Sequence, residues 1–169
     1  VYDNAPAFWD AFDSQKSDQR EAMVAMMNKA FRAIAKRGNA VIVGRGGYVV
    51  LGGVADVLNV RIQAPLEARA KRLREVLKLA DYSAAERDAK ERDRVRSLFM
   101  ESAYGKKVEP ASAFDLVVNT EKVPEEKAIA LIIELARGLE KSSAGAKNVA
   151  SALEVDPVLA EAVGEALSE

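Results

Sequence analysis

The chain has 169 residues, of which 49% are hydrophobic and 30% charged, and its formal net charge is −1. This length fits one compact domain, and the near-neutral charge gives no reason to expect nucleic acid or an anionic membrane as a partner. The chain contains no cysteine and no histidine, which excludes disulfides, thiolate zinc sites, cysteine nucleophiles and histidine bases. Phosphoryl transfer stays open, because there a protein mainly positions groups and neutralises charge.

The apolar stretches of the chain and its first residues indicate where the protein is located and whether a segment precedes Val1. No apolar stretch approaches the roughly 20 residues that a membrane-spanning helix needs, and no signal-peptide pattern opens the chain. We therefore expect a cytoplasmic protein. The first residue is Val1 rather than methionine, which favours a missing upstream segment.

Helical and strand-like patterns alternate along the chain. Apolar residues at helical spacing predict a helix over Ser17–Arg37, and Gly38 marks its end. Three short apolar runs predict buried parallel strands within Asn39–Gly47, Val57–Ala64 and Phe114–Asn119. Strands separated by helices indicate βαβ units, so we expect an α/β fold in which helices flank a parallel sheet in three layers.

Three further helices are expected between and after these strands. Pro65 opens the first, Ser83–Glu86 resembles a capping box that starts a highly charged helix over about 83–105, and Pro124 opens an amphipathic helix. Beyond Gly138 the composition shifts to Ser, Ala, Gly and Lys.

These boundaries predict an α/β domain over 1–138, a linker over 139–148 and an acidic helical tail over 149–169. The tail could pack on the domain or on a neighbouring subunit, which would make a homo-oligomer.

Arginines that could bind phosphate follow the first two predicted strands. Arg45 stands in Gly44-Arg45-Gly46-Gly47, where the glycines would let a ligand approach the backbone while the guanidinium offers a fork to phosphate. The alternative is a tight turn with an exposed arginine. Arg69 follows the second strand, and its alternative is surface charge on a core helix.

The charged helix carries a further cluster. Arg92 and Arg96 are four residues apart and share a helix face, so they could clamp one phosphate chain, and Asp93 could hold Arg96 in place. The alternative is a solvated face laced by pairs such as Glu86 with Lys90. No metal site made by side chains alone is predicted.

The order and spacing of these features resemble the cytidylate kinase-like family of P-loop kinases. The segments that carry the resemblance are Gly44-Arg45-Gly46, the run Val-Arg-Ile-Gln-Ala-Pro-Leu-Glu-Ala-Arg-Ala-Lys-Arg that begins at Val60, Asp93 with Arg96, and Asp115-Leu-Val-Val-Asn-Thr120. The resemblance covers about Asn39 to Arg137. It implies a P-loop kinase fold that transfers phosphoryl from ATP, with Mg²⁺, to CMP or a related monophosphate.

The resemblance also implies roles for the arginines. The position matching Arg45, flanked by Gly44 and Gly46, would contact the acceptor nucleotide's phosphate, and the position matching Arg69 would lie near the acceptor site. Positions matching Arg92 and Arg96 belong to a mobile lid that closes over the transferring phosphoryl group. Asp93 would be a partner within that lid.

Two departures limit what the resemblance implies. Gly46 stands where cytidylate kinases usually have Asp after Gly-Arg, which leaves the preference for CMP open. No Gly-x-x-x-x-Gly-Lys-Ser/Thr occurs within Val1–Glu169, although this loop supplies the amides, the lysine and the hydroxyl that hold ATP and Mg²⁺.

We therefore expect that a first βα unit of roughly 30 to 50 residues is absent from the sequence, and that this chain alone performs no phosphoryl transfer. The alternative is a degenerate, non-catalytic domain that binds a nucleotide or another anion, or an assembly module.

Overall fold

A computed structural model describes residues 17–106 and 110–167. Its elements are, in chain order, α2 (Ser17–Arg37), α3 (Gly47–Leu51), β1 (Val60–Gln63), α4 (Leu66–Val76), α5 (Tyr82–Tyr104), the 3₁₀ turn η1 (Ala111–Ala113), β2 (Leu116–Asn119), α6 (Glu125–Ser142), the 3₁₀ turn η2 (Ala150–Ala152) and α7 (Pro157–Ala166). None of the helices in these ranges combines the length and the apolar character needed to cross a membrane.

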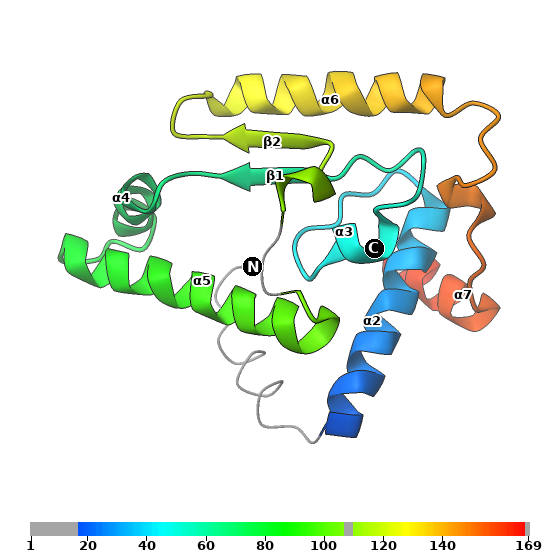
Figure 1. Cartoon of the computed structure of the whole chain (residues 1–169), viewed down its shortest axis with the longest axis horizontal. Helices are drawn as coiled ribbons and strands as arrows, with labels where there is room; N and C mark the ends of the chain where they lie inside the picture. The colour runs from blue at the N-terminus through cyan, green and yellow to red at the C-terminus, as the bar shows by residue number, and fades with distance from the viewer. Residues whose placement is uncertain (1–16, 107–109, 168–169) are drawn as a thin grey trace.

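The sheet of the described residues consists of β1 and β2. The two strands are parallel, with Val60 opposite Leu116 and Gln63 opposite Asn119. In Figure 1 both arrows point toward α4, while α6 lies beyond β2 and α5 lies on the side of β1. The strands predicted within Val57–Ala64 and Phe114–Asn119 are thus confirmed, although each strand is shorter than the apolar run from which it was predicted.

The strand predicted within Asn39–Gly47 does not form. Residues 40–43 adopt no regular structure. Val41 and Val43 are 90% and 75% exposed. A strand needs a neighbour that pairs its backbone N–H and C=O groups, and within the described ranges β1 is paired on one edge only, by β2. This part of the chain is therefore a helix-rich α/β structure with a two-stranded parallel sheet, and the expected three-layer sheet is not formed by it.

Two hydrophobic clusters hold α2 to the remaining elements. The first contains Phe31 of α2 with Leu51, Val54, Ala150 and Leu153. The second centres on Phe99 and Met100 of α5, and its half-buried neighbours include Met23 and Met27 of α2 and Tyr48 and Val49 of α3. Met27 packs against both clusters, so α2 links α5 on one side to the C-terminal segment on the other.

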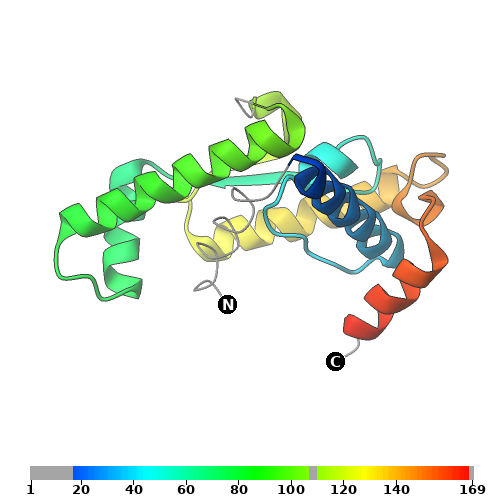
Figure 2. The ribbon, with the colours of Figure 1, turned by 90° about the horizontal axis from the view of Figure 1, so that it is seen from below.

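The predicted tail helix packs against the first described helix. Figure 2 shows α7 crossing close to α2, and the two helices are in contact. Arg37 Nη1 donates a hydrogen bond to the Gly164 carbonyl at 2.5 Å, and Lys36 Nζ donates to the Leu153 carbonyl at 2.8 Å. The C-terminal segment therefore contacts the α/β part of its own chain.

The charged helix α5 begins slightly earlier than the sequence predicts. Asp81 is its N-cap, and the carboxylate accepts a hydrogen bond from the Ala84 N–H at 2.6 Å. Ser83 lies inside the helix, so the expected capping box is wrong: Asp81 caps the Ala84 N–H, two residues before the Glu86 N–H that a Ser83 cap would have bonded. At the other end Gly105 adopts φ 64° and terminates the helix, as predicted.

Candidate anion-binding site

Small side chains bring α4 and α5 close together just beyond the sheet. Ala70 of α4 and Ala85 and Ala89 of α5 are at most 1% exposed, and the two helices are in extensive contact. Alanine occupies little space, so the helix axes can approach and longer side chains next to the alanines can meet across them. This packing positions the charged residues described next.

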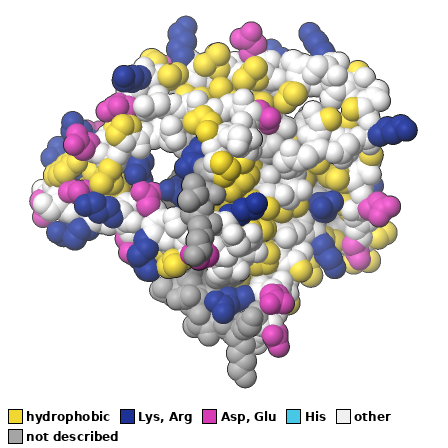
Figure 3. Space-filling model, in the orientation of Figure 1, with side chains coloured by type: hydrophobic (Ala, Val, Ile, Leu, Met, Phe, Trp, Pro, Cys, Tyr) yellow, Lys and Arg dark blue, Asp and Glu magenta, His cyan; other side chains and the backbone are white. Residues whose placement is uncertain are grey.

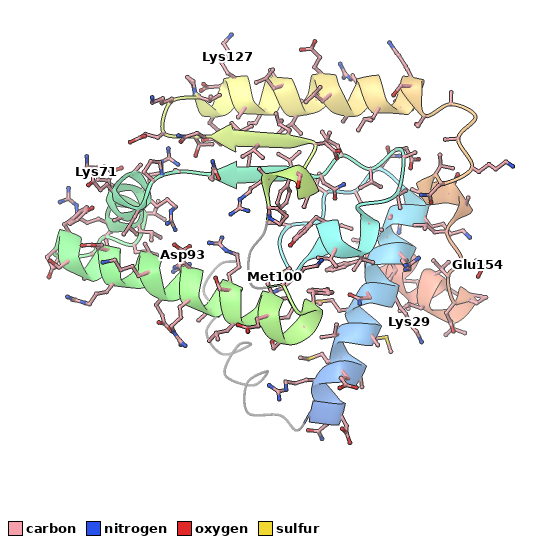
Figure 4. The ribbon with its side chains drawn as sticks, in the orientation of Figure 1. Lys29, Lys71, Asp93, Met100, Lys127 and Glu154 are labelled. Carbon is pink, nitrogen blue, oxygen red and sulfur yellow. The ribbon has the colours of Figure 1, made fainter. Side chains whose placement is uncertain are left out.

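Asp93 is the point at which two arginines meet. Arg69 of α4 donates from Nη1 and Nη2 to the two carboxylate oxygens of Asp93, at 2.9 and 2.7 Å, and from Nε to the Ala64 carbonyl at 3.0 Å. Arg96 also donates to Asp93 Oδ1. Figure 4 shows Asp93 on the side of α5 that faces the sheet. We call Arg69, Asp93 and Arg96 the aspartate cluster.

A second arginine of α4 ties this helix to the sheet. Arg72 Nη1 donates to Thr120 Oγ1 at 2.9 Å, and Nη2 donates to the Thr120 carbonyl. Thr120 directly follows β2, and its N–H bonds the carbonyl of Gln63, the last residue of β1, at 2.9 Å. The cluster therefore lies beyond the carboxyl ends of both strands, the edge at which open α/β sheets bind ligands.

Several other charged residues of α5 pair with one another along its exposed surface. Arg92 Nε lies 2.8 Å from Asp88 Oδ2, and Lys90 lies 2.6 Å from Glu86. Figure 3 shows acidic and basic side chains intermixed over α4 and α5. Of the residues predicted on this helix, Asp93 and Arg96 thus join Arg69, whereas Arg92 pairs one turn back with Asp88 instead of clamping with Arg96.

The Gly44–Gly46 turn is the second group of predicted site residues. Gly44, Arg45 and Gly46 have φ angles of 73°, 57° and 76°, and the Gly47 N–H bonds the Gly44 carbonyl at 3.3 Å. Left-handed backbone costs a residue with a side chain roughly 1–2 kcal/mol, so Arg45 needs outside support. Arg45 is half-buried, and this burial lowers the pKa of its guanidinium from the usual value.

That support includes Tyr104, which the sequence analysis missed. The Tyr104 hydroxyl lies 3.1 Å from the Arg45 carbonyl and 2.8 Å from Asn28 Oδ1. A Cβ atom at Gly46 would stand 2.4 Å from the Tyr104 ring. The ring thus fills the space that a side chain at position 46 would take, and glycine is the residue that fits. The only signal in the sequence is an aromatic residue directly before the helix-ending Gly105.

The aspartate cluster and the Gly44–Gly46 turn are separated along α5. Arg96 belongs to the first, and Tyr104 supports the second. At a rise of 1.5 Å per residue, these two positions lie about 12 Å apart along the helix axis. The structure therefore brings together Arg69, Asp93 and Arg96, whereas the backbone carbonyl of Arg45 is bonded about two helical turns further along α5, at Tyr104.

Mg²⁺ finds no suitable set of side-chain ligands in the described residues. No group of three acidic side chains in 17–106 and 110–167 could hold a metal ion. Asp93 already accepts hydrogen bonds from two arginines, which is an unsuitable surrounding for a cation. The charge that this region can bind is negative.

Comparisons with known proteins give the chain relatives. A sequence profile described as the cytidylate kinase-like family matches residues 2–122. A cytidylate kinase from Staphylothermus marinus is 33% identical over 100 residues, covering 59% of this chain and 55% of that protein. One from Ignicoccus hospitalis is 38% identical over 98 residues, covering 58% and 56%. The chain thus spans about half the length of the cytidylate kinases it matches.

Two other results complete the comparison. A uronate isomerase from Corynebacterium glutamicum is 34% identical over 94 residues, which is 56% of this chain and 18% of the isomerase. That likeness concerns one segment of the isomerase only. No solved structure matches the chain.

Proposed function

Since this chain belongs to the cytidylate kinase-like family, we propose that it is a nucleoside monophosphate kinase-like domain that binds nucleotide phosphates through its arginines. The observation that carries the proposal is the convergence of Arg69 and Arg96, from two helices, on the carboxylate of Asp93. Guanidinium forks match the oxygens of a phosphate as they match those of a carboxylate. A phosphate can therefore take the place of Asp93 between the same two arginines.

The charges support an anion at this point. Two guanidinium groups face one carboxylate, so the aspartate cluster keeps a net positive charge of one. The side chains of Arg69 and Asp93 are 31% and 36% exposed, so a ligand can reach them from solvent. A monophosphate, with its charge near −2 at neutral pH, is attracted to this cluster more strongly than a chloride or a carboxylate.

Arg45 supplies the second contact in this proposal. It binds the acceptor phosphate, while Arg69 and Arg96 act on the phosphoryl group in transfer. In this proposal α5 swings about its Tyr104 end when the nucleotide binds and brings Arg96 toward the phosphate at Arg45, as lids of phosphoryl-transfer enzymes do. Arg92 follows α5 in this movement but has no phosphate contact of its own.

Catalysis needs a donor site in addition. P-loop NTPases hold the ATP phosphates and Mg²⁺ with the amides, lysine and hydroxyl of the phosphate loop, and Val1–Glu169 contains no such motif. The proposal for these residues is therefore nucleotide binding. In a coupled assay with ATP and CMP, UMP or AMP we expect no turnover by this chain, and turnover would mean that other residues hold ATP.

Isothermal calorimetry with CMP, UMP, AMP and inorganic phosphate tests the binding proposal. Losing one arginine–phosphate contact removes about 1.5–3 kcal/mol, so Arg96→Ala and Arg45→Ala should weaken nucleotide binding by roughly 10- to 100-fold. Arg94→Ala is the matched control, because it removes the same charge from the same helix and its pair is Glu91. We expect it to change affinity by less than about twofold.

The pattern of affinities also separates the alternatives. A kinase acceptor site binds one nucleoside monophosphate more tightly than the others and more tightly than phosphate alone. A non-catalytic anion-binding domain binds all four ligands alike. If the chain binds none of them, or if Arg94→Ala weakens binding as much as Arg96→Ala does, the proposal fails.

A further inference from the structure

We propose that Tyr104 is a positioning residue that locks the Gly44–Gly46 turn through its hydroxyl and so fixes where Arg45 points. The proposal rests on the proposed phosphate-binding role of Arg45 for its functional consequence. The locking itself is a property of the fold and can be measured separately.

The turn needs a lock because its own backbone supports it poorly. Three consecutive residues have positive φ, and one of them, Arg45, carries a side chain. The residues before it, 40–43, have no regular structure. After the turn, the Val49 N–H donates a hydrogen bond to the Gly46 carbonyl at 2.9 Å. This bond stabilises the end of the turn but does not involve the Arg45 carbonyl.

The Tyr104 hydroxyl is placed to hold that peptide. Its oxygen lies 3.1 Å from the Arg45 carbonyl and 2.8 Å from the side-chain amide of Asn28 on α2. A hydroxyl has one proton to donate. Rotation of the Asn28 amide by half a turn puts its NH₂ group next to the hydroxyl oxygen, and the proton is then directed at the Arg45 carbonyl. α2, α5 and the turn thus meet at one oxygen atom.

Packing on both sides fixes the ring of Tyr104, and this fixes the position of its hydroxyl oxygen. Phe99 contacts it edge-to-face, with ring centroids 6.0 Å apart. On the other side Gly46 lets the ring approach to a distance that any Cβ atom would prevent. Burial, with a smaller contribution from Tyr48, raises the pKa of Tyr104 to about 12, so the hydroxyl stays protonated and able to donate throughout the neutral range.

This placement connects the two groups of the candidate site. Tyr104 is the last residue of α5, and Arg96 lies on the same helix. Tyr104 therefore holds this end of α5 at the turn, and a movement of α5 that carries Arg96 toward a bound phosphate pivots about this end and leaves Arg45 in place. Tyr104 touches neither nucleotide nor phosphate in this scheme and acts through Arg45.

Amide hydrogen exchange tests the lock without any ligand. Tyr104→Phe keeps the ring and removes the hydroxyl, so the fold should persist. We expect the Gly47 amide, which bonds across the turn to Gly44, to exchange about three to ten times faster, as the loss of one neutral hydrogen bond implies. Tyr82→Phe, the same change at the opposite end of α5, should leave it unaffected. Unchanged exchange in Tyr104→Phe overturns the proposal.

A double-mutant cycle then tests whether the lock acts through Arg45. With CMP as the probe in calorimetry, Tyr104→Phe should weaken binding about three- to ten-fold, and it should add nothing in an Arg45→Ala background. Equal losses in both backgrounds indicate general destabilisation and overturn the positioning role. If the wild-type chain binds no CMP, the proposed function fails, and the exchange rates alone decide whether Tyr104 locks the turn.

Discussion

The aspartate cluster and the Gly44–Gly46 turn hold their arginines in opposite ways. Arg69 and Arg96 are held by ion pairs to a carboxylate that is 36% exposed, whereas Arg45 sits on a left-handed backbone next to a half-buried neutral hydroxyl. Ion pairs near the surface weaken with salt and exchange partners readily, but packed contacts do not. The cluster can therefore release its arginines to a phosphate, while the turn presents Arg45 at a fixed place.

The largest effect on stability is expected at Gly46, where close packing against the Tyr104 ring leaves no room for a side chain. Gly46→Ala places a Cβ atom 2.4 Å from the Tyr104 ring at a φ of +76°. It should lower the free energy of unfolding by about 2–3 kcal/mol, the sum of the left-handed backbone cost and the displaced ring. Urea denaturation measures this change.

Gly44→Ala is the matched control for that experiment. Its φ is +73°, but nothing lies within 4 Å of the added Cβ atom. It should therefore cost only the backbone part, about 1 kcal/mol. Equal costs at both positions would mean that the Tyr104 ring does not limit the turn, and the contrast between a packed turn and an ion-paired cluster would lose its basis.

A smaller effect on stability is expected at Asp93, where ion pairs rather than packing hold the side chains. Asp93→Asn weakens the hydrogen bonds to both Arg69 and Arg96 and should lower the free energy of unfolding by about 1–2 kcal/mol at low salt. Because the Debye length falls to about 3 Å at 1 M salt, the loss should shrink there. The urea midpoint of the variant and of the wild type, each at low and high salt, gives the answer.

Asp88→Asn controls for the loss of one charge on α5. Its partner Arg92 lies on the same helix, one turn away, so the pair connects no two elements and should matter by less than about 0.5 kcal/mol. If Asp93→Asn is as harmless as Asp88→Asn, the buried alanines alone hold α4 to α5, and the cluster is a set of surface pairs.

The elements that could be predicted from the sequence are those whose interactions join residues close together in the chain. The helix over Ser17–Arg37 was predicted with its observed bounds, because helical hydrogen bonds and the apolar stripe are properties of neighbouring residues. The strand within Asn39–Gly47 was predicted and is absent, because an apolar run shows a tendency to be buried but not whether a pairing strand lies beside it.

The same rule applies to the candidate site. Glycines around Arg45 mark a turn in the sequence itself, and Asp93 with Arg96 share a helix face at a spacing of three. The pairing of Arg69 with Asp93 joins residues 24 apart, and that of Tyr104 with Asn28 joins residues 76 apart. Nothing local marks these partners, which is why surface charge on a core helix was the better explanation of Arg69 taken alone and Tyr104 was missed.

The last expected effect concerns pH, and it separates the two regions most cleanly. Burial raises the pKa of Tyr104 from 10.0 to about 12. A group that binds its proton more tightly in the folded state contributes stability that is complete below its unfolded pKa and is lost as the pH rises through the folded one. The wild type should therefore lose stability between about pH 10 and about pH 12 relative to Tyr104→Phe, which has no hydroxyl to ionise.

The aspartate cluster should not contribute to this loss. The cluster contains no tyrosine hydroxyl, and Asp93→Asn leaves the Tyr104 hydroxyl in place. The free energy of unfolding of Asp93→Asn should thus run parallel to that of the wild type from about pH 9 to about pH 12, while the curve of Tyr104→Phe diverges from both. Contributions from groups that all three proteins share cancel in the differences. If Tyr104→Phe also ran parallel, the hydroxyl would be as well solvated as that of a free tyrosine, and it could not hold the Arg45 carbonyl in the way its position indicates.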